Sequence, residues 1–454
     1  MKNGSFNLKR QKFFIHIRSS LWFVPSLIIL GAILLAVTLT EIDLRLDHPL
    51  RSWWPRLFGI GADGARAMLS AIATSMATVA GVVFSITMVV LTLASTQYTT
   101  RVLRNFMRDR LTQVVLGVFV GVYLYCLLVL RTVSGGDDEF VPSVAILGGI
   151  ALAIIATGFF IYFIHHISSS IQASKIVSDI TKETLDVLDH LFPQDVGDEA
   201  DEVTAAAADA HADWHCVPST QMGYIATVDS EALLDFARQH RTLLRMECGI
   251  GEFTAPGRTL LYMAADRPPD KKTIEALNAI YAVASYRTID QDAAFGIRQL
   301  VDISLKALSP SINDSTTAST CIEHLSVLLA YCAPRRMAGA YRSDDAGFLL
   351  IAKGPTFDYL VSLAFSQILE NAEGNLEIMI QLLTAIDHIA RVARTRSRLE
   401  VLRKWADAID ETAHRTLKAS HARRRLAEKM ASVRAILEAN RLPQVPMCQA
   451  AGSG

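Results

Sequence analysis

Apolar side chains dominate the first part of the chain, in four long runs separated by short polar segments. The runs lie at about residues 21–39, 68–95, 111–131 and 141–166. A helix needs about 20 predominantly apolar residues to cross the roughly 30 Å hydrocarbon core of a bilayer, and each run is of that length or longer. The pattern predicts a mainly α protein whose residues 1–167 form a transmembrane domain of four helices.

The second run carries a face of small or hydroxyl-bearing side chains, which we call the hydroxyl stripe. Its members recur in steps of three and four, the spacing that places residues on one side of a helix. They are Ser70, Thr74, Thr78, Gly81, Ser85, Met88, Thr92 and Thr96, with Met88 the one large side chain among them. Small residues let helices approach closely in lipid, so the stripe predicts helix packing. The alternative is a pore lining, in which several copies of this helix surround an axis.

Basic residues are distributed unevenly around the four runs. They are frequent near the start of the chain and after the second run, where they include Arg101, Arg104, Arg108 and Arg110. The loop at 134–139 is acidic. Cytoplasmic loops carry an excess of Lys and Arg, so both termini are predicted to be cytoplasmic. The four arginines are interpreted as an anchor that meets lipid headgroups. If the stripe lines a pore, they instead surround its cytoplasmic mouth and favour anions.

From residue 168 the pattern becomes that of a soluble protein. Residues 168–222 are predicted to be a helical extension of the fourth span and an acidic linker, and residues 223–263 a small β-rich module. Residues 264–440 are predicted to be a helical cytoplasmic domain, and residues 441–454 a disordered tail. Helices are expected at 271–286, 292–308, 315–333, 357–372, 376–394 and 398–440, with a short hairpin around 343–347. Three glycines of the fourth span are available for close helix packing: Gly148, Gly149 and Gly158.

Residues 288–318 hold the densest polar chemistry of the soluble part. Arg298 and Asp302 are spaced i, i+4, so they can pair on one helix face. In the stretch 309–317 a proline breaks one helix, and Asn313, Asp314 or Ser315 caps the next. The alternative is a loop that offers polar side chains and free helix-start N–H groups to a small anionic ligand. The candidate ligand residues are Asp290, Arg298, Asp302, Ser311, Asn313 and Asp314.

Several functional classes are disfavoured by the remaining sequence. The formal net charge is −1, and no nucleic-acid motif is present, so no nucleic-acid partner is expected. The six cysteines form no CxxC pair, and we expect no metal and no cofactor. Walker, dinucleotide-glycine, HExxH and GxSxG signatures are absent, so we expect no enzymatic activity. The arginine-rich carboxy-terminal helices, which include residues 423–425, are interpreted as a solvated face, with a surface for an anionic leaflet or another subunit as the alternative.

Four sequence strings together resemble one known family. They are Val83–Ser95, Arg101–Phe106, Asp292–Leu300 and Ala307–Asp314. The chain resembles the bacterial family of predicted membrane proteins named domain of unknown function 2254. That resemblance implies four amino-terminal spans and a cytoplasmic domain at a bacterial inner membrane. It implies no activity, cofactor or catalytic residue.

Two functional hypotheses follow from these patterns. In the first, the protein is a homo-oligomeric channel or small-solute pathway, lined by the hydroxyl stripe and gated by the cytoplasmic domain. Four spans are few for a pathway within one chain, and the sequence shows no inverted repeat, so conduction requires several copies. In the second, the spans anchor a cytoplasmic sensor or scaffold that does not conduct. The expected partners are membrane lipids, other copies of the chain, and an ion or small anionic ligand.

Overall fold

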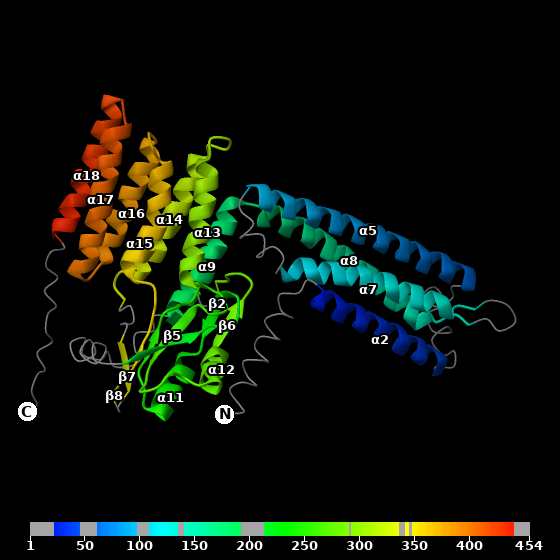
Figure 1. Cartoon of the computed structure of the whole chain (residues 1–454). Helices are drawn as coiled ribbons and strands as arrows, with labels where there is room; N and C mark the ends of the chain where they lie inside the picture. Colours follow the sequence, from blue (N-terminus) through cyan, green and yellow to red (C-terminus); the bar gives the residue numbers. More distant parts are fainter. Residues whose placement is uncertain are drawn as a thin grey trace, which may run out of the picture. The chain divides into compact units, whose positions relative to one another are not determined.

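The computed structural model describes residues 22–45, 61–97, 109–134, 140–191, 213–289, 292–335, 341–344 and 347–439. The described chain is mostly helical, with small sheets only after residue 213, which confirms the predicted fold class (Figure 1). Two compact units separate at Gln172 and Ala173. We call them the N-terminal unit and the C-terminal unit and describe each by itself.

The N-terminal unit contains four described helices that are long and apolar enough to cross a membrane, which confirms the four predicted spans. They are α2 (Phe23–Arg45), α5 (Ala62–Gln97), α7 (Arg110–Thr132) and α8 (Ser143–Ser170). α5 has 36 residues, so at about 1.5 Å per residue it is longer than a hydrocarbon core is thick.

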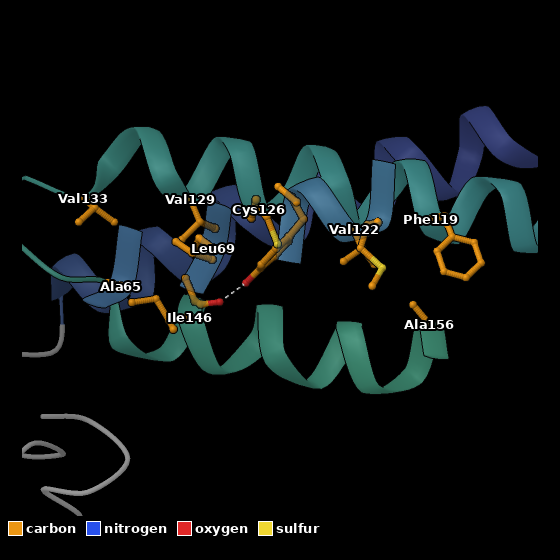
Figure 2. Close-up of a cluster of buried hydrophobic side chains, with 14 of the residues drawn as sticks. Ala65, Leu69, Phe119, Val122, Cys126, Val129, Val133, Ile146 and Ala156 are labelled. Atoms are coloured by element: carbon orange, nitrogen blue, oxygen red, sulfur yellow. Dashed lines mark hydrogen bonds between the residues drawn. The ribbon is translucent and has the colours of Figure 1, made fainter. Parts of the chain in front are cut away.

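α7 is the central helix of this unit and packs against α2, α5 and α8. Figure 2 shows apolar side chains from α5, α7 and α8 pointing toward one another, among them Leu69, Val122 and Ile146. The contact between α2 and α7 is close at Gly117, where an added Cβ would lie 2.9 Å from the Pro25 Cα. The four helices therefore enclose a packed apolar core.

Two hydrogen-bonded contacts connect this core to the start of α8. The Tyr125 hydroxyl on α7 donates to the Ala145 carbonyl at 2.6 Å. The Asp43 carboxylate on α2 accepts from the Val144 and Ala145 amides at 3.0 and 2.9 Å. Pro142, at the N-cap of α8, provides no side-chain cap. Asp43 thus satisfies from another helix the N–H groups that begin α8.

The fourth span differs from its prediction in two respects. Gly148 and Gly149 do face close neighbours, since a Cβ at either would meet the Tyr125 side chain. Gly158 has no atom within 4 Å of its hypothetical Cβ, so it does not serve close packing within the described unit. The predicted helical extension is interrupted: α8 ends at Ser170, and a separate helix, α9 (Ala173–Leu191), follows.

The C-terminal unit contains more strands than its sequence pattern predicts. A five-stranded sheet has the order β1-β5-β3-β8-β7, and a three-stranded sheet has the order β4-β2-β6. Their strands are β1 (Trp214–Pro218), β2 (Gly223–Val228), β3 (Leu244–Met246), β4 (Phe253–Thr254), β5 (Thr259–Ala264), β6 (Tyr281–Ala284), β7 (Tyr341–Asp344) and β8 (Gly347–Ile351). All pairs are antiparallel except β3 and β8.

Four strands of these sheets lie outside the predicted β-rich module. β1 falls in the predicted linker and pairs with β5. β6 falls in the predicted helix 271–286, which ends early, as α12 (Lys271–Ile280). A short apolar run fits a buried strand as well as a helix, and pairing with β2 decides the outcome. The predicted hairpin is confirmed as β7–β8, but β8 also joins β3.

Helices complete the C-terminal unit. α11 (Ser230–His240) and α12 accompany the sheets, and the remaining helices pack side by side (Figure 1). Those are α13 (Ala293–Leu308), α14 (Ser315–Cys332), α15 (Phe357–Asn371), α16 (Leu376–Val392), α17 (Arg396–Thr416) and α18 (Ser420–Ala439). The single predicted helix 398–440 is therefore two helices, α17 and α18, divided after Thr416. α9 packs on α13 and α14.

Candidate functional site

A polar cleft of about 730 Å³ opens at one end of the helices of the C-terminal unit. It lies where the turn between α13 and α14 meets the turn between α15 and α16, beside α18. The cleft is lined by Leu308, Pro310, Asn313, Asn371, Glu373, Gly374, Asn375, Leu376, Glu377, Ile380, Gln381 and Arg425.

The α13–α14 turn is held by its own backbone and by one aspartate. Pro310 cannot continue α13 because it has no N–H to donate. Asn313 adopts a left-handed conformation with φ of 49°, which asparagine tolerates better than most residues. The Asp314 carboxylate accepts from the Thr317 amide at 3.0 Å and from the Thr317 hydroxyl at 2.6 Å, which caps α14. The same hydrogen bonds lower the pKa of the Asp314 carboxyl.

The α15–α16 turn is built in a comparable way. Gly374 has a φ of 77°, a conformation open to glycine without steric cost. The Asn375 side chain caps α16 by accepting from the Ile378 amide at 3.3 Å. Its amide group also donates to the Ser315 hydroxyl at 3.1 Å. This hydrogen bond joins the two turns that form the cleft.

The polar side chains of the cleft fall into two groups. Glu373 accepts from Arg415 at 2.7 Å, and Gln381 donates to Glu323 at 3.1 Å, so both are engaged within the protein. Three others lining the cleft make no side-chain hydrogen bond or ion pair to any residue that the structure describes: Asn313, Glu377 and Arg425. The cleft therefore offers an amide, a carboxylate and a guanidinium to a ligand.

The structure brings only part of the predicted ligand set to this cleft. Asn313 lines it, whereas Asp314 is occupied as a helix cap and the Ser311 hydroxyl lies 3.4 Å from that of Ser309. Arg298 and Asp302 form the predicted i, i+4 ion pair at 2.8 Å on α13, apart from the cleft lining. Asp290 lies outside the described residues.

Six polar cleft residues were absent from the predicted set: Asn371, Glu373, Asn375, Glu377, Gln381 and Arg425. They belong to the end of α15, the α15–α16 turn, α16 and α18, all distant in sequence from the 288–318 stretch. Only their arrangement in the folded unit brings them to the turn at Asn313. No local spacing in the sequence signals that meeting.

A second polar cluster lies where a loop of the sheet region meets the start of α13. Asp292 is buried and caps α13 by accepting from the Phe295 amide at 3.0 Å. The Arg287 guanidinium donates to the same carboxylate at 2.7 and 2.8 Å. Burial raises the pKa of the Asp292 carboxyl, and the arginine opposes that rise. Gly251 lies directly against this ion pair, since an added Cβ would overlap the Asp292 Oδ2 atom.

The hydroxyl stripe of α5 faces away from the other helices of the N-terminal unit. All eight of its residues are exposed, while the packed face of α5 includes Leu69, Ala73 and Val83. The hydroxyls of Thr78 and Thr92 donate to the carbonyls four residues earlier at 2.9 Å. Those hydroxyls are thus satisfied within α5. In the described part of one chain, the stripe makes no helix packing.

The basic segment after α5 falls mostly outside the described residues, which exclude Arg101, Arg104 and Arg108. Arg110 is the first residue of α7 and is exposed. Asp109 caps this helix, accepting from the Thr112 amide at 3.2 Å. The His166 ring on α8 lies 3.2 Å from the same carboxylate. No local spacing in the sequence signals this contact, because Asp109 and His166 are 57 residues apart.

Within the described ranges, no group of three or more His, Cys, Asp or Glu side chains is arranged to hold a metal ion.

The comparisons with known proteins agree with this architecture. A family model described as a predicted membrane protein, domain of unknown function 2254, matches residues 18–388. Three mycobacterial proteins, two from strains of Mycobacterium tuberculosis and one from Mycobacterium bovis, are each 33% identical to the chain over 333 residues. All three are named as uncharacterized proteins. The match covers 71% of this chain and 63% of each relative, which is less than two thirds of the relatives' length. No solved structure matches the chain.

Proposed function

The chain belongs to the family of predicted membrane proteins named domain of unknown function 2254, and we propose that it is a membrane-anchored receptor for a small polar molecule. The four spans of the N-terminal unit are the anchor, and the C-terminal unit binds the ligand in the cleft at Asn313. The observation that carries this proposal is the set of three unengaged polar side chains lining a cleft of about 730 Å³. Small-molecule sites commonly have volumes of about 300–1,000 Å³ and a few convergent polar groups.

The distribution of basic residues supports the placement that this function requires. Lys and Arg are frequent before the first span and between the second and third. By the positive-inside rule both termini, and with them the C-terminal unit, lie on the cytoplasmic side of a bacterial inner membrane. The ligand is then a cytoplasmic molecule.

The test is a thermal-unfolding screen of the detergent-solubilised full chain. The panel comprises amino acids, nucleotides, sugar phosphates and dicarboxylates at millimolar concentration. A ligand that binds the folded state raises the melting temperature by mass action. Ile380→Trp fills the cleft, and Val327→Trp places the same ring on an exposed position of α14 outside it. We expect one compound class to stabilise the wild type and Val327→Trp but not Ile380→Trp. Absence of any such class refutes the receptor.

A second candidate is conduction between several copies of the chain. It is favoured by the exposure of the whole hydroxyl stripe on α5. The described helices of one subunit pack instead around an apolar core on the opposite face of α5. Copies meeting around an axis would bring the stripes together as the wall of a pathway for an ion or small solute.

Planar-bilayer recording separates this candidate from the receptor alone. Ser85→Leu adds bulk to the stripe, and Ser75→Leu makes the same change at an exposed position of α5 outside it. Conduction predicts unitary currents that Ser85→Leu alters and Ser75→Leu leaves unchanged. Silence from a correctly assembled oligomer, or equal effects of the two substitutions, excludes a pathway along the stripe.

A further inference from the structure

The cleft has a charge pattern that selects a particular class of ligand. We propose that it binds a small zwitterion with one ammonium and one carboxylate group, of which a free amino acid is the simplest kind. This inference rests on the receptor function proposed above and specifies its ligand.

The first argument is the balance of charge in the cleft. Its charged side chains are Glu373, Glu377 and Arg425, and Glu373 is already paired with Arg415 at 2.7 Å. One carboxylate and one guanidinium therefore remain for a ligand. A purely anionic ligand would leave Glu377 uncompensated, and a purely cationic ligand would leave Arg425 uncompensated. Because an unpaired charge is costly to remove from water, a ligand carrying both signs fits best.

The second argument is the set of helix ends at the cleft. α13 ends at Leu308 and α15 ends at Asn371, so carbonyl ends with partial negative charge face this region. α16 begins at Leu376, so its amide end contributes partial positive charge. Backbone dipoles of both signs thus accompany side chains of both signs. The exposed Asn313 amide adds a donor and an acceptor that serve either end of the ligand.

The third argument is the apolar part of the lining, which consists of Leu308, Pro310, Leu376 and Ile380. A bound molecule therefore meets hydrocarbon as well as charge. Among zwitterions this favours amino acids with aliphatic side chains.

Isothermal titration of the detergent-solubilised full chain tests the proposal with three matched probes. L-leucine carries both charges, its methyl ester carries only the ammonium, and N-acetyl-L-leucine carries only the carboxylate. Losing one charge-assisted hydrogen bond weakens binding about 10-fold or more. We expect the wild type to bind L-leucine, or another standard amino acid tested in the same way, at least about 10-fold more tightly than either blocked form.

Two substitutions assign the charged groups. With Glu377→Gln, the amino acid should bind no better than its N-acetyl form, and with Arg425→Gln it should bind no better than its methyl ester. Matched controls are Glu428→Gln and Arg424→Gln, exposed residues of α18 that do not line the cleft. Each control should bind as the wild type does, and an unchanged melting temperature of each variant without ligand shows that it is folded.

Each alternative result overturns the zwitterion. If only one of the blocked forms binds, the ligand carries a single charge. A different result is that no amino acid binds, while a nucleotide or sugar phosphate stabilises the wild type but not Ile380→Trp. In that case the receptor function stands and the proposed ligand class is wrong. If Ile380→Trp prevents no binding at all, both the receptor and this inference fall.

Discussion

Replacing Gly251 by alanine should destabilise the C-terminal unit by more than the unfavourable backbone conformation of the alanine alone. Gly251 has a φ of 81°, and its added Cβ would overlap the Asp292 Oδ2 atom and lie 2.7 Å from the Arg287 Nη2 atom. Gly257 is a matched control because its φ is 85° and nothing lies within 4 Å of its hypothetical Cβ. Both substitutions incur the left-handed backbone penalty of about 1–2 kcal/mol. Only Gly251→Ala also displaces a buried carboxylate from its arginine.

The magnitude of that second contribution follows from the burial of the pair. The Asp292 side chain is 6% exposed and that of Arg287 is 24% exposed. Breaking a buried ion pair costs about 3–5 kcal/mol, and the partial exposure of the arginine favours the lower end. Gly251→Ala should therefore reduce the free energy of unfolding by about 3 kcal/mol more than Gly257→Ala does.

Urea unfolding of the detergent-solubilised full chain, followed by tryptophan fluorescence, measures this difference. Combining Gly251→Ala with Asp292→Ala provides a further check, since the second substitution removes the carboxylate that the new methyl group would strike. The two effects should then sum to less than their separate values. Equal stability of Gly251→Ala and Gly257→Ala, or strict additivity in the double variant, would refute the reasoning.

Three further outcomes follow from the packing and the charges. Gly296→Ala should cost about 1–3 kcal/mol in urea unfolding, because its Cβ overlaps the Thr184 hydroxyl, and Thr184→Ala should restore part of the loss; full additivity would contradict this contact. Burial lowers the pKa of His324, so the unfolded chain binds more protons near the ordinary value of about 6.5. The urea midpoint should decrease as the pH is lowered from 8 to 5, and His324→Gln should make the midpoint depend less on pH. An unchanged pH dependence in His324→Gln would argue against this role of His324. In the N-terminal unit, Gly148→Leu should lower the melting temperature in detergent while Gly158→Leu should not, and equal effects would exclude the Tyr125 contact as the cause.

The membrane part of the fold was predictable because its signal is local. Twenty or so apolar residues in one run satisfy the length of a span without reference to any partner. The helix cap at Asp314 was likewise readable, since this residue lies directly before the helix from whose first turn it accepts a hydrogen bond. Within the membrane part, the incorrect predictions concern details that depend on neighbouring helices, such as the packing role of Gly158.

The sheets were only partly predictable because strand pairing is decided between distant segments. β6 has the composition of a helix end, and its identity depends on hydrogen bonds to β2. The cleft shows the same limit. Asn313 was identified from its turn, but Glu377 and Arg425 become cleft residues only when α16 and α18 pack beside that turn. In the sequence, Arg425 is one more arginine on a solvated helix.

The parallel pairing of β3 with β8 has a consequence for the folding of this protein during its synthesis on the ribosome. Leu244 pairs with Leu350, and α12, α13 and α14 are made between them. At about 5–20 residues per second, roughly 100 intervening residues take about 5–20 s to be translated. During that interval the edge of β3 that β8 will cover is open to strands of other chains. The nascent protein therefore passes through a stage in which its spans are complete and its five-stranded sheet still lacks β8 and β7.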